Sequence, residues 1–203
     1  MPIKVTRKLL HKDPVVATFD NCATVEECQA IIKSFDGSME RAVVSGDKKG
    51  IESKGRTNSV KWVPHNFSST SKSLCSRISQ IVGLPLNVAE NMQVIKYEVD
   101  QEYRAHFDAF DEGTKRGLRN IKNGGQRLYT ALFYLNDNYE GGATHFPKLD
   151  INVTPATGRC LVFGNCIKGT NERTPVSLHA GRPVTSGVKW AFNLWFRERT
   201  INR

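Results

Sequence analysis

Seven short runs of β-branched and aromatic residues fill the second half of the sequence, and they constrain the fold more than any other feature. They cover residues 92–99, 103–110, 127–136, 143–147, 159–163, 176–181 and 188–198. Turn-forming residues separate the runs, a pattern typical of antiparallel strands. The chain has 203 residues, 39% of them apolar, which is enough for one domain with a real hydrophobic core. A single domain over residues 1–203 is therefore expected, with sheet predominating in its C-terminal two-thirds.

Two amphipathic helices are predicted before these strands. In residues 24–35, Thr24 and Glu27 stand in capping-box register and apolar residues follow at helical spacing. In residues 68–85 the helical spacing recurs, and a Gly-Leu-Pro sequence ends the pattern. Residues 45–59 between them are rich in Gly, Ser and Lys without periodicity, which predicts a mobile loop or a weak hairpin. Helices followed by many strands indicate an α+β fold in which the helices back a sandwich or barrel.

The net charge of +9 and the pI near 9.4 permit attraction to nucleic acid, anionic surfaces or acidic peptides, although a solvated basic surface explains them equally. The N-terminus has no apolar core of signal-peptide length, and no window approaches the ~20 apolar residues of a membrane span. We therefore expect a soluble, cytoplasmic protein without a membrane partner. The five cysteines form no CxxC motif, so reduced and mostly buried thiols are expected.

A His-x-Asp pair, His106 and Asp108, lies inside the aromatic-rich run 103–110. On a strand, residues i and i+2 project from one face about 7 Å apart, so the two side chains can converge while Phe107 faces away. An imidazole and a carboxylate favour a borderline divalent metal ion. One more histidine completes the 2-His-1-carboxylate triad of non-heme Fe(II) oxygenases. Because a surface or capping His-x-Asp pair is commoner, the metal hypothesis requires that second histidine.

His179 is the best candidate for the second histidine. His11, His65 and His145 lie in segments more typical of structural or solvent-facing histidines. His179 instead stands near the predicted end of a strand, and the turn at residues 183–187 separates it from a final strand that carries its own polar residues.

The final predicted strand, from residue 188, has two different faces. One face carries only apolar residues and is core: Val188, Trp190, Phe192, Leu194 and Phe196. The other face is mixed: Lys189, Ala191, Asn193 and Trp195. This second face is either solvated or lines a polar pocket inside a barrel, and alternation alone does not distinguish the two.

Four segments together resemble the catalytic domain of the prolyl 4-hydroxylases, a family of Fe(II)/2-oxoglutarate dioxygenases. They are "QVIKYEVDQEYRAHFD", "GGQRLYTALFYLND", "YEGGATHFPKLDINVTPATGRCLVF" and "LHAGRPVTSGVKWAFNLWFRE". The resemblance is closest to short, single-domain microbial and viral members and spans roughly residues 20 to 199. It includes "GRTNSV", which is similar to the family's "RTSSG" loop. The resemblance implies a double-stranded β-helix, a jelly-roll or cupin-like barrel, backed by the N-terminal helices.

The resemblance also implies roles for single residues around the metal. His106, Asp108 and His179 match the three iron ligands of the family. Lys189 matches the lysine that pairs with the C5 carboxylate of 2-oxoglutarate. Tyr97 matches a tyrosine whose hydroxyl contacts the co-substrate, with a cross-strand core aromatic as the alternative.

Three further residues match positions that meet the substrate. Trp195 and Arg127 fall where the family places peptide-contacting side chains, and Arg56 lies in the loop that folds over the peptide. The long basic segment at residues 111–125 has no assigned role.

The implied reaction is hydroxylation of peptidyl proline at C4, with Fe(II), 2-oxoglutarate, O2 and ascorbate as cofactors and with succinate and CO2 as products. A proline-containing peptide or protein is the implied partner. Oxidative demethylation of nucleic acid is a rival that the +9 charge favours, but Lys189 replaces the arginine pattern typical of those enzymes. Free proline or another small amino acid is a further possible substrate, and a non-catalytic binding module is the rival from another class. The sequence indicates neither the particular protein substrate nor the oligomeric state.

Overall fold

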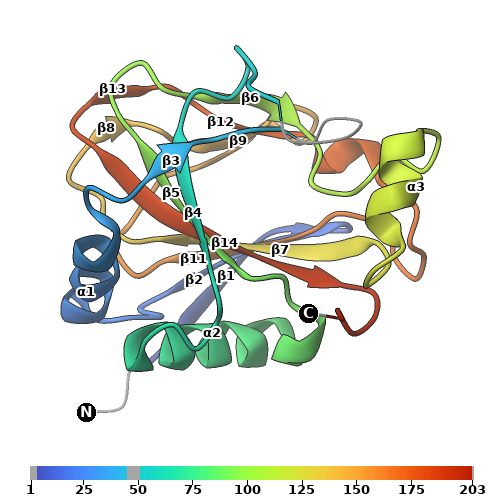
Figure 1. Cartoon of the computed structure of the whole chain (residues 1–203), viewed down its shortest axis with the longest axis horizontal. Helices are drawn as coiled ribbons and strands as arrows, with labels where there is room; N and C mark the ends of the chain where they lie inside the picture. Colours follow the sequence, from blue (N-terminus) through green and yellow to red (C-terminus); the bar gives the residue numbers. More distant parts are fainter. Residues whose placement is uncertain (1–3, 45–50, 203) are drawn as a thin grey trace.

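The computed structural model describes residues 4–44 and 51–202 of the chain, and within them two β-sheets face each other (Figure 1). The larger sheet has eight strands, in the order β1-β2-β11-β7-β14-β5-β4-β3. Their bounds are β1 Thr6–Lys12, β2 Val15–Asp20, β3 Glu40–Arg41, β4 Ser59–Val63, β5 Met92–Tyr97, β7 Arg127–Tyr134, β11 Cys160–Gly164 and β14 Lys189–Arg197.

The smaller sheet has four strands, in the order β10-β9-β12-β6. They are β6 Tyr103–His106, β9 Thr144–Phe146, β10 Ile151–Val153 and β12 His179–Gly181. A third, two-stranded sheet pairs β8 (Glu140–Gly141) with β13 (Val184–Ser186). The ladders of all three sheets are antiparallel, which confirms the predicted α+β class with a sandwich or barrel of antiparallel strands.

Both predicted amphipathic helices are confirmed. Helix α1 (Val25–Phe35) begins with a capping box in which Thr24 and Glu27 exchange hydrogen bonds. Helix α2 (Ser69–Val82) ends at Gly83, which has the left-handed conformation with φ of 76°. Both helices cover the outer face of the larger sheet, where Figure 1 shows them on the side away from the smaller sheet.

The sequence analysis did not predict α3 or the strands β1, β2, β3, β4, β8, β10 and β13. The β1–β2 hairpin precedes α1, so the expected order of helices followed by strands is wrong at its start. β1 is an edge strand with mostly exposed side chains, and it therefore shows no apolar alternation. Helix α3 (Lys115–Ile121) lies in the basic segment 111–125, with a cap at Thr114. Its seven residues are too few to show helical periodicity.

The predicted loop at residues 45–59 is partly visible as a weak hairpin. Isolated antiparallel bridges join Val44 to Ile51 and Ser53 to Arg56. Residues 45–50 lie outside the described residues. The short 3-10 turns η1 (Leu86–Val88) and η2 (Pro175–Ser177) complete the described elements.

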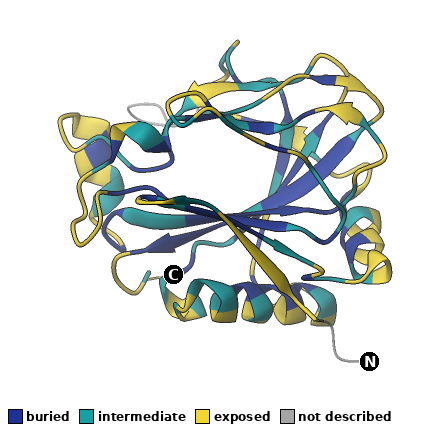
Figure 2. Cartoon of the chain, turned by 180° about the vertical axis from the view of Figure 1, so that it is seen from behind, coloured by how far each residue is buried: buried dark blue, intermediate teal, exposed yellow. Residues whose placement is uncertain are grey.

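β14 separates two apolar layers, as its predicted alternation requires. Its even-numbered residues pack toward α1 and α2, and within this layer the rings of Phe133 and Phe192 stack with their centres 4.9 Å apart. Its odd-numbered residues face the space between the sheets. Figure 2 shows the result, with buried residues along the strands of the larger sheet and exposed ones on the outer sides of the helices.

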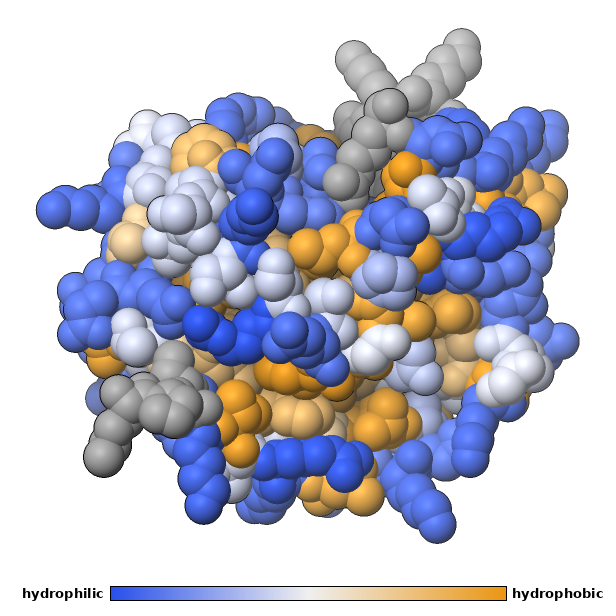
Figure 3. Space-filling view, turned by 90° about the horizontal axis from the view of Figure 1, so that it is seen from below, coloured by the Kyte–Doolittle hydropathy of each residue, from blue (hydrophilic) through white to orange (hydrophobic). Residues whose placement is uncertain are grey.

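The outer surface agrees with this layering. Seen from the side of α2, hydrophilic residues surround smaller hydrophobic areas (Figure 3). All five cysteines are buried and free, as predicted. No helix in the described part of the chain is long and apolar enough to cross a membrane.

Phe192→Ala should lower the free energy of unfolding by about 3–5 kcal/mol, because it leaves a cavity under the helices where Phe133 loses its stacking partner. Denaturant unfolding followed by circular dichroism measures the change. The matched control is Phe67→Ala, at a side chain that is 49% exposed, and it should cost much less. Equal losses in the two variants would contradict the assignment of Phe192 to the core.

Candidate active site

The three predicted metal ligands lie close together where the smaller sheet pairs β6 with β12, two segments that are distant in the sequence. β12 pairs with β6 in a register that sets His179 directly opposite His106. Asp108 follows shortly after the end of β6. Its Oδ1 lies 3.7 Å from Nε2 of His106, and its Oδ2 lies 3.6 Å from Nε2 of His179. One ligand atom from each of the three side chains lies within 4.8 Å of the others.

The backbone at Asp108 differs from the predicted strand. β6 ends at His106 and the chain bends at Asp108, so the prediction of one strand over residues 103–110 is wrong beyond His106. The backbone leaves the smaller sheet here because the Asp108 carboxylate binds Thr130 on β7 of the opposite sheet. His179 likewise begins a strand instead of ending one, and the short β13 intervenes before β14.

Each imidazole is fixed by a backbone carbonyl. Nδ1–H of His106 donates to the Arg104 carbonyl at 2.8 Å, and Nδ1–H of His179 donates to the Ser177 carbonyl at 2.9 Å. In this tautomer the lone pair of each Nε2 is directed toward Asp108. Burial lowers the pKa of His106, and the neighbouring His179 ring lowers it further. The His106 ring is therefore neutral, as a metal ligand must be.

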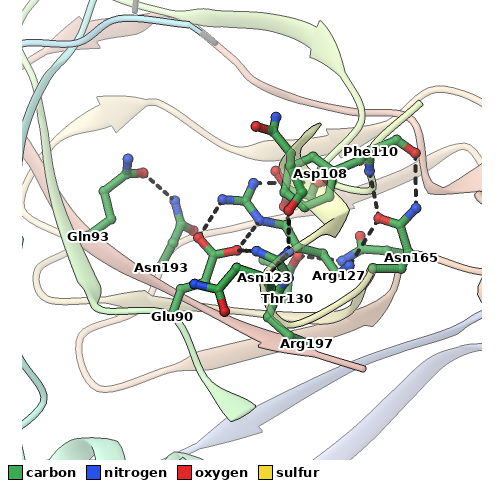
Figure 4. Close-up of polar contacts among 12 residues, drawn as sticks. Glu90, Gln93, Asp108, Phe110, Asn123, Arg127, Thr130, Asn165, Asn193 and Arg197 are labelled. Carbon is green, nitrogen blue, oxygen red and sulfur yellow. Dashed lines mark hydrogen bonds and ion pairs between the residues drawn. The ribbon is translucent and has the colours of Figure 1, made fainter. Parts of the chain in front are cut away.

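Asp108 is held by a chain of hydrogen bonds that begins in the larger sheet (Figure 4). Asn165 Nδ2 donates to Thr130 Oγ1 at 2.9 Å, and the Thr130 hydroxyl donates to Asp108 Oδ2 at 2.7 Å. Burial alone would raise the pKa of Asp108, but the two imidazoles and the Arg127 guanidinium hold it below its usual range. The carboxyl is therefore ionised and acts only as an acceptor.

Two neutral imidazole nitrogens and one carboxylate oxygen form a donor set that fits a borderline divalent ion such as Fe(II). Residues 4–44 and 51–202 contain one group of three or more His, Cys, Asp or Glu side chains in such proximity. The ring of His11 hydrogen-bonds to the Pro14 carbonyl and that of His65 to the Glu90 carbonyl, as expected of structural histidines.

Lys189 lies at the start of β14 and is buried in the space between the sheets, with 1% of its surface exposed. Nζ donates to the Gly142 carbonyl at 2.6 Å, and no described carboxylate lies within ion-pair distance of it. Burial lowers the pKa of Lys189 to about 7. The polar face of β14 therefore lines a pocket instead of meeting solvent. A buried cation without a partner is costly, which is expected where an anionic ligand completes the pair.

Tyr97 borders the same inner pocket from the neighbouring strand. On β5 it is paired with Lys189 in the strand register, and Nζ of Lys189 lies 5.1 Å from the centre of its ring. Burial raises the pKa of the Tyr97 hydroxyl, which therefore keeps its proton and can donate a hydrogen bond. Thr144 and Asn193 also line this pocket, together with the three metal-ligand candidates.

A second, open groove of about 720 Å³ leads from the surface to His106 and Asp108. The three predicted substrate residues all line it: Trp195, Arg127 and Arg56. Trp62 on β4 was not predicted, yet it also lines the groove, with its ring centre 5.6 Å from that of Trp195. It is 45% exposed, and a large aromatic side chain at an exposed position of a strand is the signal that marks it.

Arg127 is held in place by an ion pair (Figure 4). Its guanidinium donates to both carboxylate oxygens of Glu90, at 2.6 and 2.7 Å, and Arg197 donates to the same carboxylate at 2.8 Å. Burial opposes ionisation of Glu90, but the two arginines hold its pKa below the usual range. The Arg127 guanidinium lies 4.0 Å from the centre of the Trp195 ring. The sequence analysis missed Glu90, because no local motif marks a carboxylate whose partners are distant in the chain.

Comparison with known proteins assigns the chain to a family. Residues 92–197, which include the metal-ligand candidates and Lys189, match the model of the 2OG-Fe(II) oxygenase superfamily. A protein of Acanthamoeba polyphaga mimivirus whose name assigns it to the prolyl 4-hydroxylases is 38% identical over 184 residues, which cover 90% of this chain and 74% of that protein.

Two solved structures share the fold. One is the viral collagen prolyl hydroxylase of Paramecium Bursaria Chlorella virus-1, solved as a 2OG complex, with a TM-score of 0.71 at 23% sequence identity. The match covers 90% of this chain and 95% of that one. A prolyl hydroxylase of Trichoplax adhaerens, in complex with a hypoxia inducible factor oxygen degradation domain peptide fragment, has a TM-score of 0.65 at 16% identity, with 83% of that chain and 90% of this one covered. These likenesses confirm the predicted double-stranded β-helix. The chain thus belongs to the prolyl 4-hydroxylase family within the 2OG-Fe(II) oxygenase superfamily, and it is a dioxygenase that depends on Fe(II), 2-oxoglutarate and O2.

Proposed function

We propose that this enzyme hydroxylates proline residues within peptide chains at C4. The observation that carries the proposal is the meeting of two cavities at one point. A small inner pocket with a buried cation and a larger groove with aromatic walls are both lined by His106 and Asp108. This division suits a small anionic co-substrate inside and a polypeptide outside. The relatives named for prolyl 4-hydroxylation support the same reaction.

We assign His106, Asp108 and His179 as the iron ligands. Their Nδ1 contacts and the Thr130 hydrogen bond fix the three donor atoms before a metal arrives, so little reorganisation is needed on binding. When bound, the iron and 2-oxoglutarate supply the oxidising chemistry, in which O2 is consumed, succinate and CO2 are released and one oxygen atom is left on the product. Ascorbate serves as the reductant that keeps the metal in its active state.

We assign Lys189 and Tyr97 to the co-substrate. The Lys189 ammonium would neutralise the distal carboxylate of 2-oxoglutarate, and the Tyr97 hydroxyl would donate a hydrogen bond to it. Both side chains come from the centre of the larger sheet, so their positions are rigid. The apolar walls of the pocket exclude water, which strengthens the charge pair.

We assign the groove to an extended, proline-containing chain. Such segments favour the polyproline II conformation and bind against aromatic side chains, which Trp195 and Trp62 provide. Arg56 lies at the floor of the groove and stacks on Tyr103, with the guanidinium 4.6 Å from the ring centre. The Arg127 guanidinium lies near the rings of Trp195 and Phe110 and is paired with Glu90, so Arg127 supports the aromatic wall of the groove. A groove of about 720 Å³ is larger than free proline requires.

Loss of one metal ligand should lower the affinity for Fe(II) by at least about tenfold. The variants are His106→Ala, Asp108→Ala and His179→Ala, and anaerobic equilibrium dialysis with metal analysis measures binding without reference to activity. His11→Ala is the matched control, since its ring hydrogen-bonds to the Pro14 carbonyl and is not among the metal-ligand candidates, and it should bind one Fe(II) per chain like the wild type. Wild-type affinity in His179→Ala would show that the assignment is wrong.

The affinity for 2-oxoglutarate should fall as the pH rises above about 7. Burial lowers the pKa of Lys189 to about 7 in the free enzyme, and a bound carboxylate raises it again. Affinity is therefore complete below pH 7 and is lost above it by at most about tenfold per pH unit. Calorimetric titration of the Mn(II)-loaded protein between pH 6 and about 8.5 measures this, with proton uptake expected at pH 8.

Lys189→Met is the control for that titration. It should weaken binding by roughly a hundredfold or more at pH 6.5, as expected when one partner of a buried charge pair is removed, and it should abolish the pH dependence. A pH dependence that persists in Lys189→Met would assign the titrating group elsewhere.

Proline-rich peptides should gain one oxygen per modified proline when they are incubated with enzyme, Fe(II), 2-oxoglutarate and ascorbate. Mass spectrometry with fragmentation locates the hydroxyl group, and the best peptide should have a higher kcat/KM than free proline or a methylated oligonucleotide. Trp62→Ala should raise the peptide KM several-fold while uncoupled 2-oxoglutarate turnover persists, because Trp62 lines the outer groove and does not line the inner pocket. Faster turnover of free proline or of the oligonucleotide than of every peptide would refute the proposal.

A further inference from the structure

The groove has a strong excess of positive charge along its lining. Six arginines line it: Arg56, Arg104, Arg116, Arg119, Arg127 and Arg173. The acidic side chains on its lining are Asp108 and Asp111. Because Asp108 is assigned to the metal, Asp111 is the one lining carboxylate left to balance these cations.

Arg127, Arg104 and Arg173 are each paired with a carboxylate in the described part of the chain. Arg127 is paired with Glu90 at 2.6 Å and Arg104 with Glu102 at 2.9 Å, and both carboxylates lie outside the lining of the groove. Arg173 contacts Asp111 at 3.4 Å, and its guanidinium also lies 4.4 Å from the centre of the Phe107 ring. These contacts hold Arg127, Arg104 and Arg173 in place at the groove.

Arg56 is a buried cation that binds neutral groups. It is 8% exposed, and its guanidinium donates to Asn58 Oδ1, to the Val43 carbonyl and to Gln93 Oε1 at 3.1 to 3.2 Å. No carboxylate in the described part of the chain lies within ion-pair distance of it. Its charge therefore adds to the positive potential at the floor of the groove.

Helix α3 brings Arg116 and Arg119 to the rim. Its position is fixed at both ends, because Thr114 caps its start and Arg197 donates to the carbonyls of Asn120 and Asn123 at its end. Figure 1 shows α3 at the opposite edge of the molecule from α1.

Close packing fixes α3 as well. A Cβ at Gly117 would collide with the Asp111 carbonyl, so this turn of the helix lies directly against the preceding loop. Arg116 and Arg119 are exposed, and both line the groove, whereas Lys115 on the same helix is exposed but does not line it.

We propose that the groove selects prolines that are flanked by aspartate or glutamate, and that Arg116 and Arg119 of α3 together with Arg173 recognise these acidic side chains. This inference rests on the proposed function, since it names the class of peptide that the same groove takes. Guanidinium groups bind carboxylates with two parallel hydrogen bonds, and a one-sign groove raises the rate at which an oppositely charged chain arrives. The net charge of +9 acts in the same direction over a longer range.

The test compares peptides that share one proline-containing centre and differ only in their flanks. The flanks are acidic, neutral or basic, and each is placed on the N-terminal or the C-terminal side of the proline. Hydroxylation is measured by mass spectrometry at low and at moderate salt. The acidic peptide is expected to have a kcat/KM at least tenfold above that of the neutral one at low salt, mainly through KM, and the difference should shrink as salt rises.

The charge-reversed variant Arg116→Glu/Arg119→Glu should remove or invert this preference, with a larger loss of kcat/KM for the acidic peptide than for the neutral one. Lys115→Glu is the matched control on the same helix and should retain most of the preference. Equal kcat/KM for all flanks, or a preference that the double variant keeps, would overturn the inference and leave proline hydroxylation itself intact.

A binding measurement separates this inference from the proposed function. A fluorescent acidic peptide with alanine in place of the proline cannot be hydroxylated, but it should bind the Mn(II)-loaded enzyme at least tenfold more tightly than its neutral counterpart. If no peptide is hydroxylated yet this difference is found, the proposed reaction fails and the acidic recognition stands. If a single-stranded oligonucleotide competes for the groove more strongly than the acidic peptide does, and the double variant abolishes that competition, the groove is a nucleic-acid site and the inference is wrong.

Discussion

The antiparallel pairing of β12 with β6 is the contact on which the active site depends. It sets His179 opposite His106, although the two histidines are far apart in the sequence. The backbone carbonyls that follow from this pairing fix both rings in one tautomer, so that each Nε2 points to a common centre. Asp108 completes the donor set only because the strand ends and the chain bends toward Thr130 in the other sheet. The proposed metal centre therefore lies where the two sheets meet.

One strand of the larger sheet, β14, contributes both to the hydrophobic core and to the two cavities. The apolar face of β14 anchors α1 and α2, and its polar face supplies Lys189 to the inner pocket and Trp195 to the outer groove. Burying the Lys189 ammonium costs desolvation free energy, and the packing of the strand around it offsets that cost. A rigid strand therefore holds this charge in place better than a loop would. The depressed pKa of Lys189 reflects that cost, and a bound carboxylate would relieve it. Stability and co-substrate binding are linked here because β14 supplies both core side chains and Lys189.

The two cavities differ in the number and arrangement of their positive charges. The inner pocket has a single buried cation that suits a small dicarboxylate. The outer groove is lined by several arginines, among them Arg127, which is paired with Glu90, and two on α3. The ion pair between Glu90 and Arg127 connects the two regions, because it holds a guanidinium against both the Trp195 ring and the Asp108 backbone. Part of the protein's positive charge thus lies along the groove where a substrate would enter.

The sequence by itself determined the residue types of the metal centre, the two amphipathic helices and the two faces of the last strand. The helices and the two faces of the last strand follow from local spacing, because a periodicity of 2 or 3.6 residues is visible within a single segment. The three metal-ligand candidates were instead matched through the resemblance to the prolyl 4-hydroxylase family. Only the tertiary structure decided that Asp108 lies beyond the end of its strand, that Glu90 binds Arg127, and that the polar face of β14 encloses a pocket. It also placed the β1–β2 hairpin and α3, whose short or exposed sequences have no periodic signal. These features depend on strand register and on pairs distant in the chain, and such contacts form only when the sheets pack against each other.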